Sequence, residues 1–309
     1  MKRPRVLAIV GPTASGKTPL SLLVAEMLAG EIVSADSRQI YKYLDIGTAK
    51  PAREERENIV HHFVDILDPL DEYSAGQFGH DASDVIKDIL SRRKVPVLVG
   101  GSGLYVKAVI DGMFDEPGKD PNVRARLDEQ YRVEGIEPLV EMLRKVDAAA
   151  LAGMREVTPR RVIRALEVFL IGGKPLSAYH QEQKSVSGYE TVQFGLEWDR
   201  KDLYNRIGRR ADQMIIDGLV DEVMDLKARG YDRRLNALNT VGYKEVFDFL
   251  DGTTDQVSMV ALLKQNTRRF AKRQVTWFKA DRRIRRIEMK EHLAMRDVAD
   301  RIVGEFKKG

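Results

Sequence analysis

The segment of this chain that most directly implies chemistry is GPTASGKT, at residues 11–18. It fits the pattern G-x-x-x-x-G-K-[ST], in which a glycine-rich backbone wraps a di- or triphosphate with its N–H groups. Its members are Gly11, Pro12, Thr13, Ala14, Ser15, Gly16, Lys17 and Thr18. Lys17 would add a full positive charge, and the Thr18 hydroxyl could hold a magnesium ion. The pattern indicates phosphate binding, against the alternative of a turn that binds nothing, but it does not say what happens to the phosphate.

A second candidate is Asp36, which directly follows an apolar run of strand length at residues 31–35. The carboxyl ends of parallel strands meet at one edge of a sheet, so Asp36 should face the phosphate loop. Three roles are open from its position. It could hold magnesium through water, act as a general base on an acceptor, or cap a turn before Ser37.

A third candidate is the sequence Gly100-Gly101-Ser102, which follows the apolar run at residues 95–99. Many phosphate-loop hydrolases have an acid at this place to position magnesium, so its absence counts against ordinary nucleotide hydrolysis. The glycines allow a backbone to approach a ligand closely, and Ser102 offers a hydroxyl. A tight strand-to-helix turn explains the same residues equally well.

These candidates need a sheet to bring them together. Strand-like runs at residues 6–10, 31–35, 63–67 and 95–99 alternate with helical patterns at 20–28 and 77–92. This alternation predicts an α/β fold of the phosphate-loop NTPase type, with a mainly parallel sheet flanked by helices.

An all-helical insertion domain is expected within this fold. A turn-rich linker at residues 115–121 precedes a helical pattern at 122–169, and a strand-like run resumes at 194–198. We therefore assign residues 1–115 and 190–309 to the catalytic core and residues 116–189 to the insertion. Further helices are predicted at 203–228, interrupted near Gly218, and at 255–278.

Composition narrows the class of protein. The 309 residues are 43% apolar and 32% charged, which is typical of a soluble globular protein. No apolar run reaches the roughly 18 residues that a membrane span needs, and the N-terminus does not look like a signal peptide. There are no cysteines, which excludes disulfides and thiol catalysis. We expect a cytoplasmic protein.

Charge and aromatic residues suggest a polyanionic partner. Residues 264–286 hold ten basic side chains against the single acid Asp281, in a chain whose net charge is only +4. Such a run indicates either nucleic-acid binding or a solvated helix face. Trp277 on this helix could stack on a base, but its place in an apolar stripe with Val260, Leu263 and Phe270 favours the core. The pair His61-His62 has no spaced partner for a metal site.

Taken together, the chain resembles the bacterial tRNA dimethylallyltransferases, also called tRNA isopentenyltransferases. The resemblance runs through eight segments in chain order. They are GPTASGKT at 11–18, SADSRQIY at 34–41, DIGTAKP at 45–51, HHFVDILDP at 61–69, GGSGLY at 100–105, RVIRALEV at 161–168, VGYKE at 241–245 and KRQVTWF at 272–278.

The resemblance implies transfer of a dimethylallyl group from dimethylallyl diphosphate to the exocyclic amine of adenosine 37 in tRNA. It implies Mg²⁺, diphosphate in the loop, and catalytic roles for Asp36 as general base and for Lys17, Thr18 and Ser102. The partner would be the anticodon stem-loop, bound by a monomer. The tRNA-binding residues that it implies are Asp36, Ser37, Arg38, Gln39, Ser102, Arg124, Arg160, Arg161, Arg164, Asn239, Thr240, Gly242, Tyr243, Lys244, Lys272, Arg273, Gln274 and Trp277.

The chain departs from the family pattern at Ser102, where threonine is usual, and at Arg160, where glutamine often occurs. The arginines at 160, 161 and 164 could grip phosphates or be simply exposed. Two other functions share part of the pattern. A phosphate-loop kinase of small metabolites would not need the basic helix, and an RNA-binding ATPase could use Asp36 for magnesium.

Overall fold

The computed structural model describes residues 3–113, 117–118, 120–182 and 188–308. The chain divides into two compact units, residues 1–110 with 187–309 and residues 111–186. Parts of the expected linker at 115–121 and of the expected loop at 185–188 lie outside the described residues.

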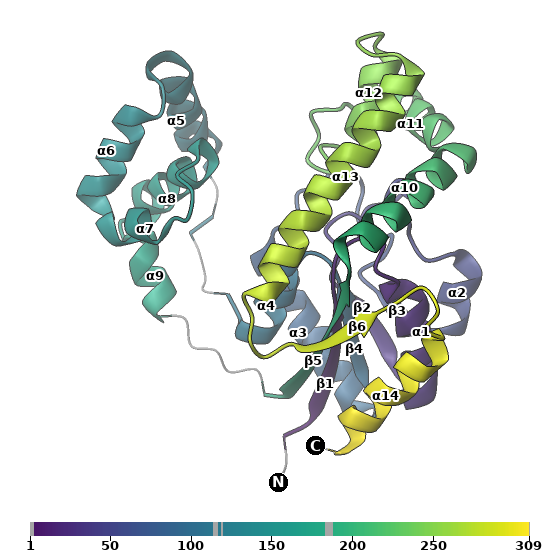
Figure 1. Cartoon of the computed structure of the whole chain (residues 1–309). Helices are drawn as coiled ribbons and strands as arrows, with labels where there is room; N and C mark the ends of the chain where they lie inside the picture. Colours follow the sequence, from purple (N-terminus) through teal and green to yellow (C-terminus); the bar gives the residue numbers. More distant parts are fainter. Residues whose placement is uncertain (1–2, 114–116, 119, 183–187, 309) are drawn as a thin grey trace. The chain divides into compact units, whose positions relative to one another are not determined.

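The first unit is built on a six-stranded, all-parallel sheet with strand order β3-β2-β4-β1-β5-β6 (Figure 1). Its strands are β1 (Arg5–Val10), β2 (Glu31–Ser34), β3 (His61–His62), β4 (Pro96–Gly100), β5 (Glu190–Trp198) and β6 (Arg285–Met289). The predicted fold class is therefore confirmed. Parallel pairing places the carboxyl ends of β1, β2 and β4 at one edge, where Gly11, Asp36 and Ser102 follow them.

Helices cover both faces of this sheet. They are α1 (Lys17–Leu28), α2 (Arg53–Asn58), α3 (Ala75–Ser91), α4 (Gly103–Asp111), α10 (Arg200–Ile216), α11 (Leu219–Ala228), α12 (Tyr243–Leu250), α13 (Gln256–Lys279) and α14 (Met295–Lys308). Successive residues of β1 point to opposite faces, so both must be apolar. Val6, Ala8 and Val10 join one buried cluster, whereas Leu7 and Ile9 join the other.

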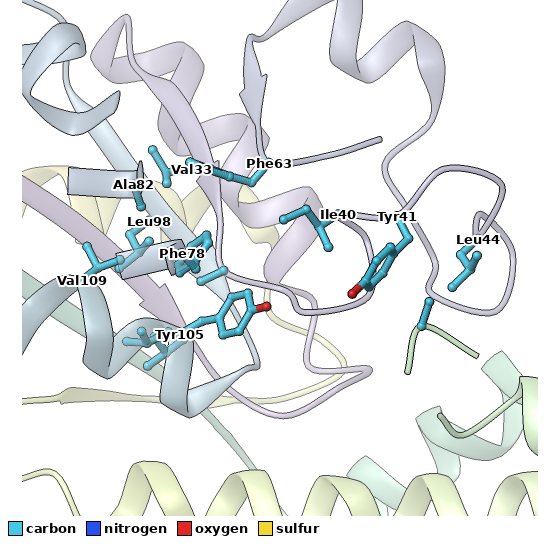
Figure 2. Packing of buried hydrophobic residues seen from close by; sticks show 14 of the residues in the cluster. Val33, Ile40, Tyr41, Leu44, Phe63, Phe78, Ala82, Leu98, Tyr105 and Val109 are labelled. Carbon is cyan, nitrogen blue, oxygen red and sulfur yellow. The ribbon is translucent and has the colours of Figure 1, made fainter. Parts of the chain in front are cut away.

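The two clusters use different helices. One contains buried residues of α3, α4, α11 and α12. In it the Phe78 ring stacks on Tyr105 at 4.4 Å between centroids and meets Phe63 edge-on at 5.0 Å, as Figure 2 shows from close by. The other cluster contains buried residues of α1 and α14, which pack together on the opposite face.

The second unit is helical, with α5 (Pro121–Glu134), α6 (Glu137–Val146), α7 (Ala148–Gly153), α8 (Pro159–Gly172) and α9 (Leu176–Glu182). The Asp120 carboxylate caps α5 by accepting from the backbone N–H groups of Asn122 and Val123. Leu127, Leu143 and Leu166 belong to a small apolar core of its own.

The limits of this unit differ slightly from those predicted. Tyr189 is buried in the first unit, where its hydroxyl donates to the Val109 carbonyl at 3.1 Å. The chain therefore rejoins the first unit before residue 190, where β5 begins, and the helical unit starts at residue 111 and not at 116. The division of labour between a catalytic core and a tRNA-binding insertion stays a prediction.

One strand prediction was wrong, and one strand was missed. The apolar run at 63–67 is no strand, because Phe63 and Asp65 have φ values of +64° and +59°, which turn the chain. Only His61–His62 pairs with β2. Strand β6 was not predicted, since it begins with Arg285 and Arg286 at the end of the basic run. It is an edge strand whose exposed Arg285, Arg286 and Glu288 alternate with buried Ile287 and Met289. The predicted break near Gly218 is confirmed between α10 and α11.

Candidate active site

The phosphate loop joins β1 to α1. Ala14 and Gly16 adopt left-handed backbone conformations, with φ of +61° and +91°. At Gly16 an added Cβ would come within 2.8 Å of the Met295 Cε, so both space and backbone favour glycine. The loop is also held from other elements, because Trp198 Nε1 donates to the Ser15 carbonyl at 3.0 Å.

Lys17 starts α1, and its ammonium donates to the Pro12 carbonyl at 2.7 Å. Burial lowers the pKa of Lys17 to about 7, opposed by the charge of Asp36 and assisted by the charge of Arg210. An arriving anion would favour the charged ammonium. We therefore expect the charge of this lysine to respond to phosphate binding.

Beside the loop lies a cavity of about 390 Å³. It is lined by residues 14–19 of the loop and the start of α1, by Ala49, and by three arginines of α10, which are Arg206, Arg209 and Arg210. Among the residues that the structure describes, no acidic side chain lines it, although Asp36 is close enough to influence Lys17 and Arg210. The cavity thus has the size and charge to hold a diphosphate-bearing molecule.

The three arginines of α10 were missed from the sequence. Arg206 Nε donates to the Ala14 carbonyl at 2.8 Å, and its guanidinium lies 4.3 Å from the centre of the Trp198 ring system. Arg210 approaches the Thr13 hydroxyl at 3.3 Å, and burial lowers its pKa. Their i, i+3, i+4 spacing was the available signal, but it does not reveal which surface a helix will face.

Asp36 follows β2, and its Oδ1 accepts from the backbone N–H groups of Arg38 at 2.9 Å and Gln39 at 3.4 Å. The turn-capping role is therefore real. It is compatible with a catalytic role, since the Asp36 carboxylate is half-buried and its charge reaches Lys17 and Arg210. The structure brings Asp36 together with the phosphate loop, as the parallel sheet predicted.

Ser102 lies next to this acid through two close contacts between the loops after β2 and β4. The Ser102 hydroxyl accepts from the Ser37 N–H at 3.0 Å, and the Ser102 N–H donates to the Ala35 carbonyl at 3.2 Å. At Gly100 an added Cβ would lie 2.1 Å from that carbonyl. The glycines thus form a tight turn. This turn brings the Ser102 hydroxyl to Ser37, the residue that follows Asp36.

The basic run forms most of α13. Lys272, Arg273 and Lys279 are exposed. The expectation that Trp277 lies in the core was wrong, since its side chain is 46% exposed and Phe278 is buried instead. The indole packs over Gly103, where an added Cβ would lie 2.2 Å from its ring. Phe270 also leaves the predicted stripe and is 37% exposed.

The remaining tRNA-binding candidates fall into three groups. Arg38, Asn239 and Lys244 belong to the first unit, where the Arg38 guanidinium donates to the Asn236 carbonyl. Gln274 and Tyr243 are buried, so their side chains hold elements together here, and direct tRNA contact by them stays a prediction. The arginines of the second unit, Arg124, Arg160, Arg161 and Arg164, lie on α5 and α8. Arg124 and Arg164 both approach the buried Glu167.

No group of three metal-ligating His, Cys, Asp or Glu side chains occurs within the described ranges. His62 Nε2 lies 2.9 Å from the buried Glu31, and His61 Nδ1 lies 2.7 Å from the Ile59 carbonyl, so both serve local structure. No helix of the described part is long and apolar enough to cross a membrane.

Comparison with known proteins places these features in a family. A family model described as IPP transferase matches residues 39–281. The tRNA dimethylallyltransferase of Geobacter metallireducens is 43% identical over 284 residues, which cover 92% of this chain and 92% of that protein. The enzyme of the same name from Thermotoga neapolitana is 47% identical over 275 residues, or 88% of this chain and 89% of that one.

Two solved structures of tRNA-modifying transferases are also similar to this chain. The full-length tRNA isopentenylpyrophosphate transferase of Bacillus halodurans has a TM-score of 0.72 at 38% identity, covering 99% of this chain and 98% of that one. A eukaryotic dimethylallyltransferase acting on tRNA has a TM-score of 0.75 at 27% identity, covering 93% of this chain and 74% of that one. Because the family match spans well over half of its length, and its relatives align with nearly all of it, this chain belongs to the IPP transferase family.

Proposed function

We propose that this protein transfers the dimethylallyl group of dimethylallyl diphosphate to the exocyclic amine of adenosine 37 in tRNA and releases diphosphate. Relatives along almost the whole chain are named for tRNA dimethylallyl transfer. The observation that carries the proposal is the juxtaposition of a basic phosphate cavity with Asp36, an acid that follows β2 at the same edge of the sheet, with β4 between β2 and β1.

The donor's diphosphate would occupy the loop. Breaking the allylic C–O bond leaves negative charge on the departing diphosphate. Lys17 and the arginines of α10 would stabilise that charge, together with the loop N–H groups. Thr18 lines the cavity from the first turn of α1, so its hydroxyl would hold Mg²⁺ together with diphosphate oxygens. The ion would supply further charge neutralisation at the leaving group.

The acceptor would enter from the side of Asp36. As the new N–C bond forms, the amine must lose a proton, and the Asp36 carboxylate would take it. The Ser102 hydroxyl, joined to Ser37, would line the same approach. In this step the allylic C–O bond breaks and the new N–C bond forms. The amine proton goes to Asp36, and diphosphate departs with the electrons of the C–O bond.

The tRNA would be held by the exposed basic face of α13 and by the arginines of the helical unit. The target base must leave its stack, which costs a few kcal/mol and is cheapest in a single-stranded loop. Phosphate contacts from Lys272 and Arg273 would offset this cost. We also propose that the protein acts as a monomer in the cytoplasm, where its tRNA substrate is made.

The test is incubation with labelled dimethylallyl diphosphate and unmodified tRNA, followed by nucleoside analysis. We expect label on the exocyclic amine of adenosine 37 only. Titration calorimetry should then show that dimethylallyl diphosphate binds. ATP that is added to the protein should not be hydrolysed. ATP turnover stimulated by RNA, or phosphate transfer to a small molecule, with no labelled nucleoside would overturn the proposal in favour of an ATPase or a kinase.

A further inference from the structure

Gln274 of α13 joins the phosphate loop to the loop after β4. Its side chain is only 7% exposed. Its Oε1 accepts from the Thr13 N–H at 2.8 Å, and its Nε2 donates to the Gly101 carbonyl at 2.9 Å. Both polar atoms of the amide thus form hydrogen bonds to residues that are distant in sequence. The nearer of the two, Gly101, is 173 residues away.

Each end of this bridge continues into a group with a proposed role. The peptide plane between Pro12 and Thr13 donates its N–H to Gln274 and accepts the Lys17 ammonium at its carbonyl oxygen. The orientation of that peptide therefore helps to set the position of the Lys17 charge.

At the other end, the peptide between Gly101 and Ser102 offers its carbonyl to Gln274. The Ser102 N–H of the same peptide donates to the Ala35 carbonyl at 3.2 Å, directly before Asp36. A continuous hydrogen-bonded path thus runs from Lys17 through Gln274 to the residue that precedes Asp36.

The space around the amide is closed. A Cβ at Gly101 would lie 2.4 Å from Gln274 Nε2 and 3.3 Å from the Gly11 carbonyl oxygen. The two loops therefore meet around the amide without room for one more carbon atom, and a buried amide with both ends bonded tolerates little displacement.

We propose that Gln274 is a positioning residue that sets the separation between the leaving-group site at Lys17 and the acceptor site at Asp36, and that it is not a direct tRNA contact. This inference rests on the proposed function. Group transfer depends steeply on the separation of the reacting groups, and a misplacement of about 1 Å can cost around 10²-fold in rate. The effect of removing Gln274 should therefore appear in kcat.

The experiment compares Gln274→Met with Gln193→Met. Gln193 lies on β5, is also buried at 2% exposure and has no assigned role, so the same substitution there controls for the loss of a buried amide. With saturating dimethylallyl diphosphate and anticodon stem-loop, we expect Gln274→Met to lower kcat by about 10²-fold. Binding constants for each substrate should stay within about threefold of the wild type, and Gln193→Met should keep kcat within the same limit.

Two results would overturn the inference. One is equal kcat in the two variants, and the other is a loss confined to stem-loop affinity, which direct tRNA contact predicts. Absence of prenylation in the wild-type protein would instead defeat the proposed function, so the two failures are distinguishable.

A double-mutant cycle decides the case if Gln274→Met folds poorly. Gly101→Ala should lower kcat in the wild type, because its Cβ displaces the amide of Gln274. In a Gln274→Ala background the clash with the amide is removed and only the 3.3 Å approach to the Gly11 carbonyl oxygen remains, so Gly101→Ala should cost at least fivefold less. Equal costs in both backgrounds would show that the two loops are positioned independently of Gln274.

Discussion

At the scale of single residues, Asp36 carries the sharpest question, because its position allows a base or a metal holder. Asp36→Asn keeps the Oδ1 acceptor that caps the turn at Arg38 and Gln39 but cannot take a proton. We expect kcat to fall by about 10² to 10⁴-fold, with binding of both substrates little changed. The measurement is a magnesium titration of the variant's turnover. Recovery to near wild-type turnover at high magnesium would assign Asp36 to the metal instead.

Lys17 allows a prediction about pH. Its pKa is lowered to about 7 chiefly by burial, so the free protein loses this charge as the pH rises above 7. Bound diphosphate favours the ammonium and raises its pKa. Binding at pH 8 should therefore take up a proton, and affinity should weaken by up to about tenfold per pH unit above 7.

This uptake is measured by calorimetric titration of dimethylallyl diphosphate in buffers of different ionisation enthalpy. Lys17→Ala should bind more weakly, turn over very slowly and show no uptake from this group. If wild type and Lys17→Ala take up protons equally, another group is responsible and Lys17 does not change its protonation when diphosphate binds.

At the scale of elements, α13 predicts a salt effect. Changing both Lys272 and Arg273 to alanine should weaken stem-loop binding and reduce the slope of log K against log salt by roughly 1 to 2, if each contacts one phosphate. Lys307 and Lys308 are exposed at the end of α14 and provide the control, since their removal changes the net charge equally. An unchanged slope in the α13 variant would mean that this face is only solvated.

The start of β2 predicts an effect on acid stability. Glu31 is 2% exposed, and hydrogen bonds from Arg92 above all, with Lys94 and His62, hold its pKa well below the usual value. This stabilisation is present above the unfolded-state pKa near 4.5 and is lost as the pH falls below it. Glu31→Gln should lower the free energy of unfolding at pH 7 by about 1–3 kcal/mol, with the difference shrinking in acid.

Urea denaturation at pH 7 and pH 3 measures this difference. Glu57→Gln is the matched control, because Glu57 pairs with Arg53 on the surface and both side chains are well exposed. We expect no change there, as exposed pairs contribute little. A pH-independent loss in Glu31→Gln would indicate a packing defect in place of a lost charge.

How much of the fold and of the site could be predicted from the sequence differs from one element to the next. Apolar runs that pair in the interior, such as β1 and β4, were visible because burial on both faces demands continuous apolar residues. The run at 63–67 is also mostly apolar, although it contains Asp65, and the left-handed backbone at Phe63 and Asp65 turns the chain away from a strand. The cavity lining could be predicted where one motif carries it, as at Lys17. It was missed where tertiary packing decides, as at Arg206 and Arg210.

At the scale of the whole molecule, the chain leaves its sheet after α4 and returns at β5, with the helical unit between. The central strand β1 is made first but pairs on one side with β4 and on the other with β5, whose first paired residue is Glu190. The middle of the sheet therefore depends on contacts far apart in sequence, a property that slows folding.

The support of the phosphate loop has a consequence for synthesis on the ribosome. The groups that hold this loop are Trp198, Arg206, Arg210 and Gln274, all of them made long after residue 18. A nascent chain ending before β5 carries the complete loop sequence but none of these supports. We expect such a fragment to bind polyphosphates weakly. We therefore expect polyphosphate binding to appear only late in synthesis, once Gln274, residue 274 of 309, has been added to the chain.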